Sequence, residues 1–101
     1  MEKVKINEIE YEIIKNNKDG FDLEEVQSKL TDYFYPYTYV VGDWAYGKLR
    51  LKGFYDSNDK NCNKTNNINN LDKYLENNCA YGCRYFEIKK ISNWNYNLYL
   101  L

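Results

Sequence analysis

The fold of this chain is decided by residues 42–55, which read Gly-Asp-Trp-Ala-Tyr-Gly-Lys-Leu-Arg-Leu-Lys-Gly-Phe-Tyr. Cations alternate with leucines here, between glycines and aromatic residues. Because side chains in a strand point alternately to opposite sides, one face carries Lys48, Arg50 and Lys52. The other face carries Leu49 and Leu51. The stretch therefore predicts a strand with an apolar face toward a core and a basic face away from it.

The preceding residues, 37–43, predict the antiparallel partner of this strand. Residues 45–47 suit a common three-residue hairpin loop, a type I turn followed by a glycine in the left-handed conformation. In that register Trp44 faces Lys48 and lies on the basic face. A slip of one residue in either strand would exchange its two faces, so the alternation within the strand is firmer than the pairing across it.

Further elements are indicated on the N-terminal side. Alternating apolar residues predict two short strands joined by a hairpin at Asn7-Glu8. Asp22 has the character of a helix N-cap, with Glu25 three residues later as its capping-box partner. Apolar residues at helical spacing follow, and they predict a helix over residues 22–34.

The C-terminal half predicts a second helix and a last strand. Residues 56–67 are nearly all Asn, Asp, Lys and Ser, too polar to order themselves by burial, so we expect a mobile loop. A helix follows between residues 66 and 78, and a strand over residues 83–90. Residues 92–101 alternate apolar and polar side chains, which predicts either an extra edge strand or a loose tail.

The predicted order β-β-α-β-β-α-β is typical of an α+β domain with a mostly antiparallel sheet and two helices. A chain of 101 residues is one domain, residues 1–101, with one core. No apolar run approaches the ~20 residues of a membrane span, and the start lacks the apolar core of a signal peptide. We therefore expect a cytoplasmic protein that does not contact a membrane.

Catalytic and metal-binding patterns are absent from the sequence. The chain has no histidine, no phosphate-binding loop and no nucleophile elbow, so we expect no enzyme, cofactor, metal or small-molecule substrate. The less favoured alternative is an enzyme that works through Asp43 and Arg50. Cys79 and Cys83 are interpreted as buried core thiols, because a zinc site usually needs four ligands at recognisable spacings.

The basic face is the candidate binding surface. Its cations repeat every ~6.6 Å along the strand, close to the phosphate spacing of an extended nucleic acid, and aromatic residues at both ends could stack on bases. An ordinary solvent-exposed face would show the same pattern. The candidate polyanion-binding or partner-binding residues are Trp44, Lys48, Arg50, Lys52 and Phe54.

Three blocks of sequence, residues 41–55, 71–79 and 81–86, resemble the YutD-like family, small cytosolic proteins of low-GC Gram-positive bacteria and their relatives. The resemblance runs from about Tyr11 to Lys90. It implies a compact α+β domain, and it supplies no activity, substrate or catalytic residue that could be assigned to positions of this chain.

Two binding hypotheses follow. The first is a non-enzymatic module whose basic strand face meets a polyanion, with RNA or a ribonucleoprotein as the leading class. The second is a protein-protein adaptor that uses the same strand or the aromatic tail. An acidic protein partner would satisfy the basic face equally well, and the net charge of -1 slightly favours it over bulk RNA.

Overall fold

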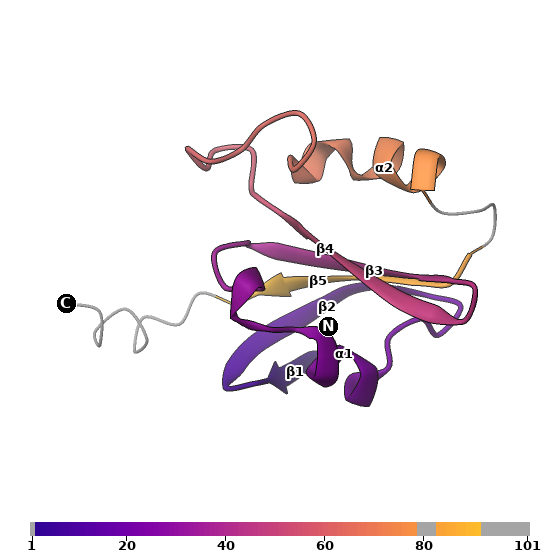
Figure 1. Ribbon diagram of the computed structural model, residues 1–101. Helices are drawn as coiled ribbons and strands as arrows, with labels where there is room; N and C mark the ends of the chain where they lie inside the picture. The colour runs from indigo at the N-terminus through magenta and orange to yellow at the C-terminus, as the bar shows by residue number, and fades with distance from the viewer. Residues whose placement is uncertain (1, 79–82, 92–101) are drawn as a thin grey trace.

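One five-stranded sheet organises the chain in a computed structural model that describes residues 2–78 and 83–91 (Figure 1). The strands are β1 (Lys3–Ile6), β2 (Ile9–Asn17), β3 (Tyr39–Ala45), β4 (Lys48–Phe54) and β5 (Tyr85–Lys90). They lie in the order β1-β2-β5-β3-β4, and each neighbouring pair is antiparallel. The predicted element order and α+β class are confirmed. The tail, residues 92–101, lies outside the described residues.

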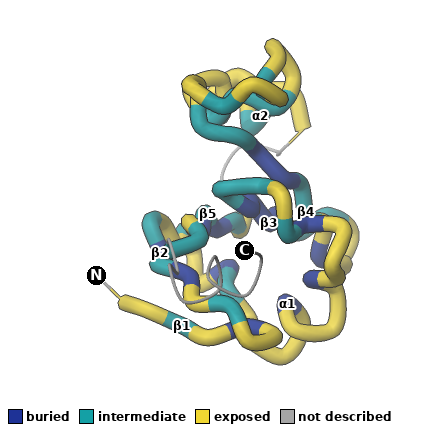
Figure 2. The backbone as a smooth tube through the Cα atoms, turned by 90° about the vertical axis from the view of Figure 1, so that its left-hand side faces the viewer, coloured by how far each residue is buried: buried dark blue, intermediate teal, exposed yellow. Residues whose placement is uncertain are grey.

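Helical segments lie on both faces of the sheet. α1 (Leu23–Lys29) and the 3-10 turn η1 (Asp32–Phe34) are on one face, and α2 (Leu71–Asn78), which follows the 3-10 turn η2 (Ile68–Asn70), is on the other (Figure 1). α1 contacts both edge strands, β1 and β4. The curled sheet and α1 together surround the interior, while α2 forms a separate outer layer (Figure 2).

The hydrophobic core fills the space between the curled sheet and α1. Its buried residues come from every strand and from both N-terminal helical segments: Ile6, Tyr11, Ile13, Val26, Leu30, Phe34, Val40, Leu49, Phe86 and Ile88. Leu49 faces this core as the alternation of residues 48–52 predicts, and Leu51 packs against it.

The β3–β4 hairpin has a different register from the predicted one. Its turn is only two residues long, Tyr46-Gly47, with φ of 53° and 74°, so Ala45 pairs with Lys48 and Trp44 pairs with Leu49. Such a turn, with both central residues at positive φ, matches the right-handed twist of the flanking strands. The predicted pairing of Trp44 with Lys48 is therefore wrong, and Trp44 lies on the face opposite the cations.

The helix predicted over residues 22–34 is divided in two. Its start is confirmed, because the Asp22 side chain accepts a hydrogen bond from the Glu25 N–H at 3.2 Å. The backbone leaves the helix at Leu30, which has ψ of 86°. The Asn7 side-chain amide donates to the Leu30 carbonyl at 2.8 Å, so a residue from the β1–β2 turn supplies a partner where the helix ends.

The cysteine prediction is wrong for Cys83. Cys83 is half-buried and its sulfur is disulfide-bonded, so it is not a free core thiol. Cys79 lies outside the described residues. Cys62 is a free, half-buried thiol in the loop between β4 and η2.

Candidate functional site

Trp44 has a structural position on the core side of the sheet. Its indole N–H donates to the Gly20 carbonyl at 2.7 Å, and the Arg84 guanidinium lies 4.7 Å from the indole ring centre. The hydrogen bond attaches β3 to the turn that leads into α1, and the ring contact joins it to the residue before β5. Trp44 is therefore separated from Arg50 and Lys52 by the sheet itself.

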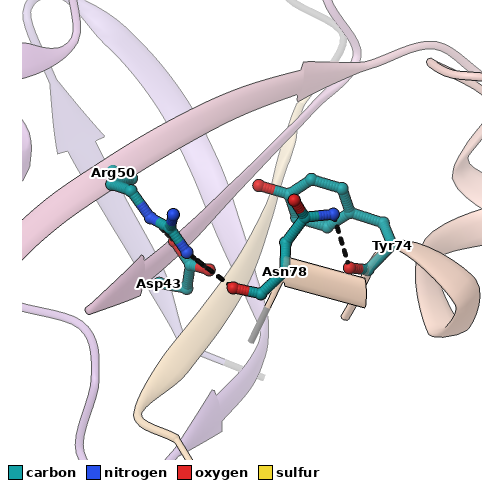
Figure 3. A network of polar contacts seen from close by, with 4 residues as sticks. All are labelled: Asp43, Arg50, Tyr74 and Asn78. Atoms are coloured by element: carbon teal, nitrogen blue, oxygen red, sulfur yellow. Dashed lines mark hydrogen bonds and ion pairs between the residues drawn. The ribbon is translucent and has the colours of Figure 1, made fainter. Parts of the chain in front are cut away.

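Arg50 and Asp43 form a two-pronged ion pair on the opposite face (Figure 3). The Arg50 Nε and Nη2 donate to the two carboxylate oxygens of Asp43 at 3.0 and 2.7 Å. Asp43 is only 1% exposed, whereas the Arg50 side chain is 47% exposed. The hydrogen bonds and charge of Asp43 raise the pKa of Arg50 above its ordinary value, so the positive charge of Arg50 is permanent and locally neutralised.

The same guanidinium also connects β4 to α2. Nη2 of Arg50 donates to the carbonyl of Asn78, the last residue of α2, at 2.7 Å (Figure 3). Helix C-terminal carbonyls lack partners within the helix and carry a partial negative charge. The guanidinium therefore supplies both a hydrogen-bond donor and an opposite charge. Both Asp43 oxygens are occupied, and the geometry gives this pair a structural role.

Lys52 and Phe54 lie beneath α2. Phe54 is 1% exposed, because the Tyr74 ring of α2 packs edge-on against it with ring centres 5.5 Å apart. The Lys52 ammonium lies 5.3 Å from the Phe54 ring centre and 5.7 Å from that of Tyr74. Phe54 therefore supports α2 from below and is not itself at the surface, while Lys48 is exposed near the hairpin turn.

A hollow lined by cations extends on both sides of Lys52. It consists of two cavities of about 530 and 470 Å³ that share Lys52, Thr65 and Tyr74 as lining residues, and we call them together the basic hollow. Arg50, Lys64 and Lys73 supply its other cations. No Asp or Glu among the described residues lines either cavity.

Lys64 is placed by the loop over residues 56–67. The base of the loop joins the end of β4, since the Tyr55 N–H donates to the Asn66 carbonyl at 2.7 Å and the Tyr55 carbonyl accepts from the Ile68 N–H at 3.0 Å. Inside the loop, the Asn63 side chain accepts from the Thr65 and Asn66 N–H groups. The expected mobility of this loop stays a prediction, but its polar side chains have a clear part in shaping it.

Comparison with known proteins decides the family. The model of a family described as "YutD-like: Putative antitoxin YutD-like" matches residues 5–89. The chain belongs to the YutD-like family. It is 42% identical over 86 residues to "Putative antitoxin YutD" of Bacillus subtilis (strain 168), a match that covers 85% of this chain and 94% of that protein.

A solved structure is similar to this YutD-like chain along most of its length. The solution NMR structure of protein yutD from B. subtilis matches with a TM-score of 0.77 and 39% sequence identity. The match covers 92% of this chain and 84% of the other. The fold described above is therefore shared with that solved structure.

Two cations of the hollow, Lys64 and Lys73, were not identified from the sequence of this YutD-like chain. Lys73 shares a helical face with Asn70 and Asn77, at i−3 and i+4, which is a detectable signal. Lys64 has no comparable signal, because its position depends on how the loop closes. Within the described ranges, no group of three Cys, Asp or Glu residues could hold a metal ion, and no helix is long and apolar enough to cross a bilayer.

The carboxyl of Glu87 in β5 predicts a pH effect on stability. Burial raises its pKa, with a smaller contribution from Asp72 and an opposing one from Lys15. Because the pKa of Glu87 is higher in the folded state than in the unfolded state, the folded state loses stability as the pH rises from the unfolded pKa through the folded pKa. We expect Glu87→Gln to stabilise the protein at pH 7, by about 0.5 kcal/mol or less since the group is half exposed.

Urea unfolding at pH 7 and at about pH 3.5, below the usual range of glutamate, tests this expectation. The increase in the free energy of unfolding caused by Glu87→Gln should be present at pH 7 and absent at the lower pH. Glu10→Gln, at an exposed position of β2, controls for the change in net charge. Loss of stability for Glu87→Gln at pH 7 would show that attraction to Lys15 outweighs the cost of burial.

Proposed function

We propose that this protein is a non-enzymatic binding module that receives an acidic segment of a partner protein in the basic hollow. The observation that carries the proposal is the lining of the hollow: lysines from β4, from the loop and from α2 converge, with no carboxylate among the described lining residues. The chain as a whole has a net charge of -1. The concentration of positive charge at this place is therefore local, as a docking surface for an anionic partner requires.

An acidic segment of a partner protein fits this charge arrangement better than an extended nucleic acid does. An RNA strand would need a continuous row of free cations with aromatic stacking platforms. In the predicted row, Arg50 is paired with Asp43, Phe54 is buried, and Trp44 packs toward the core on the other face. Lys52 of that row instead converges with Lys64 and Lys73 on a hollow, which suits a compact anionic group, while Lys48 lies outside it.

The family description supports a macromolecular partner. The family model and the 42% identical relative are both described as a "Putative antitoxin", and an antitoxin acts against a toxin. We extend that idea to this chain and infer that its partner is a protein. We retain, as part of the proposal, the cytoplasmic location predicted from the sequence.

Charge reversal in the hollow tests the proposal. Tagged wild type and Lys64→Glu/Lys73→Glu are expressed in host cells, and the co-purified protein and RNA are both quantified. We expect recovery of a protein partner to fall at least tenfold, because two attractions become repulsions in a partly desolvated interface. The matched control Lys18→Glu/Lys29→Glu changes the net charge equally at exposed positions outside the hollow, and its recovery should equal that of wild type.

RNA or a ribonucleoprotein is the competing outcome. Crosslinked RNA that disappears in the hollow variant, with affinity falling steeply with salt by about one counterion per phosphate contact, would replace the protein partner with a nucleic acid. Equal recovery from the hollow variant and its control would contradict any role of the hollow in binding.

A further inference from the structure

Tyr46 at the tip of the β3–β4 hairpin has an unusual conformation for a large side chain. Its φ is 53°, in the left-handed region that bulky residues seldom adopt, and its relative exposure is 103%. The two-residue turn it occupies favours Asn or Asp followed by Gly. Gly47 follows that preference and Tyr46 does not, so the tyrosine is unfavourable for the turn and buries nothing.

The β1–β2 hairpin shows how the same chain fills the equivalent position. Asn7 is the first residue of that turn, with φ of 50°, and its side chain donates to the carbonyl at the end of α1. Asparagine thus suits both the turn and the fold. Among the described residues, Tyr46 makes no comparable hydrogen bond or ring contact, so nothing in the fold accounts for a tyrosine there.

The location of Tyr46 connects it to the basic hollow. It directly follows Ala45, which pairs with Lys48 at the end of the strand face that also carries Arg50. Arg50 in turn lines the hollow. Tyr46 therefore extends the same surface toward the hairpin tip, beside the exposed Lys48.

We propose that Tyr46 is the aromatic anchor of this surface, and that its ring inserts into an apolar pocket of the partner protein beside the acidic segment held by the basic hollow. The inference rests on the proposed function and assigns to Tyr46 a large share of the free energy of binding. Tyrosine is a frequent hot-spot residue because it supplies a large contact area with few rotatable bonds. A turn that holds the ring away from the body of the protein presents it to a concave partner.

One substitution separates the cost to the fold from the benefit to binding. Tyr46→Asn creates the favoured Asn-Gly turn, so we expect the melting temperature to rise by about 4 °C. Recovery of the partner from host-cell lysate, quantified by mass spectrometry, should fall about thirtyfold or more, as expected for a hot spot. Tyr46→Phe, which keeps the ring, should retain binding within about threefold.

The control is Leu23→Asn, which alters an exposed apolar residue of α1 outside the basic hollow and should leave recovery unchanged. Recovery within twofold of wild type for Tyr46→Asn would overturn the anchor even if the hollow variant loses its partner. A lower melting temperature for Tyr46→Asn would show that the tyrosine does not destabilise the turn. Absence of any partner for the wild type would remove both the anchor and the proposed function.

Discussion

Replacement of Arg50 by leucine is expected to destabilise the fold by about 3–5 kcal/mol, because it leaves the buried carboxylate of Asp43 without a partner. Asp43 is 1% exposed and receives both of its side-chain hydrogen bonds from Arg50. The variant also loses the bond from Arg50 to the end of α2. Urea unfolding at pH 7 measures the change in the free energy of unfolding.

The two partners of this ion pair should behave asymmetrically. Asp43→Val leaves Arg50 half exposed to solvent, so we expect a cost of only about 1–2 kcal/mol. The double variant Asp43→Val/Arg50→Leu should be close in stability to Asp43→Val, because an apolar pair often replaces a buried ion pair without loss. Similar costs for the two single variants would show that Asp43 is not isolated from water in the way the structure indicates.

A methyl group added at Gly42 should disrupt the centre of the core. A Cβ built there would lie 2.2 Å from Cε2 of Phe86 and 3.1 Å from Cδ1 of Leu49. Phe86 is fully buried, and its ring packs edge-on against Phe21 with centres 5.1 Å apart. We therefore expect Gly42→Ala to cost about 2–3 kcal/mol, measured by urea unfolding.

A double-variant cycle identifies the cause of that cost. Phe86→Leu alone should destabilise the protein, because it removes buried apolar volume. In the double variant, Phe86→Leu makes room for the methyl group added by Gly42→Ala. The destabilisation of the double variant should therefore be smaller than the sum for the two single variants. If the destabilisations of the two single variants add up to that of the double variant, the cost of Gly42→Ala does not come from its contact with Phe86.

Elements of this fold were predictable where the signals are local. The Asn7-Glu8 hairpin, the Asp22 cap and the alternation of residues 48–52 depend on neighbours in sequence, and all three occur in the structure. The pairing of β3 with β4 depends on a turn that places a tyrosine at positive φ. Tyrosine is disfavoured at that position of a two-residue turn. The sequence therefore favoured a three-residue loop over residues 45–47.

The remaining differences arise from contacts between distant segments. α1 ends where Asn7, more than twenty residues earlier, donates a hydrogen bond to the carbonyl of the C-cap residue Leu30. The candidate site was predictable as a basic strand face, but the neutralisation of Arg50 depends on the true register, in which it pairs with Asp43. Lys64 and Lys73 join Lys52 only because the loop and α2 fold back over β4.

We propose that the basic hollow, and not the strand as a whole, receives a partner. The most direct measurement compares partner recovery for Lys64→Glu/Lys73→Glu with that for Lys48→Glu, a charge reversal on the same strand face but outside the hollow. We expect at least a tenfold loss for the hollow variant and a loss of about threefold or less for Lys48→Glu, an exposed charge at the rim. An equal or greater loss for Lys48→Glu would contradict binding in the hollow and restore the extended basic face as the binding surface.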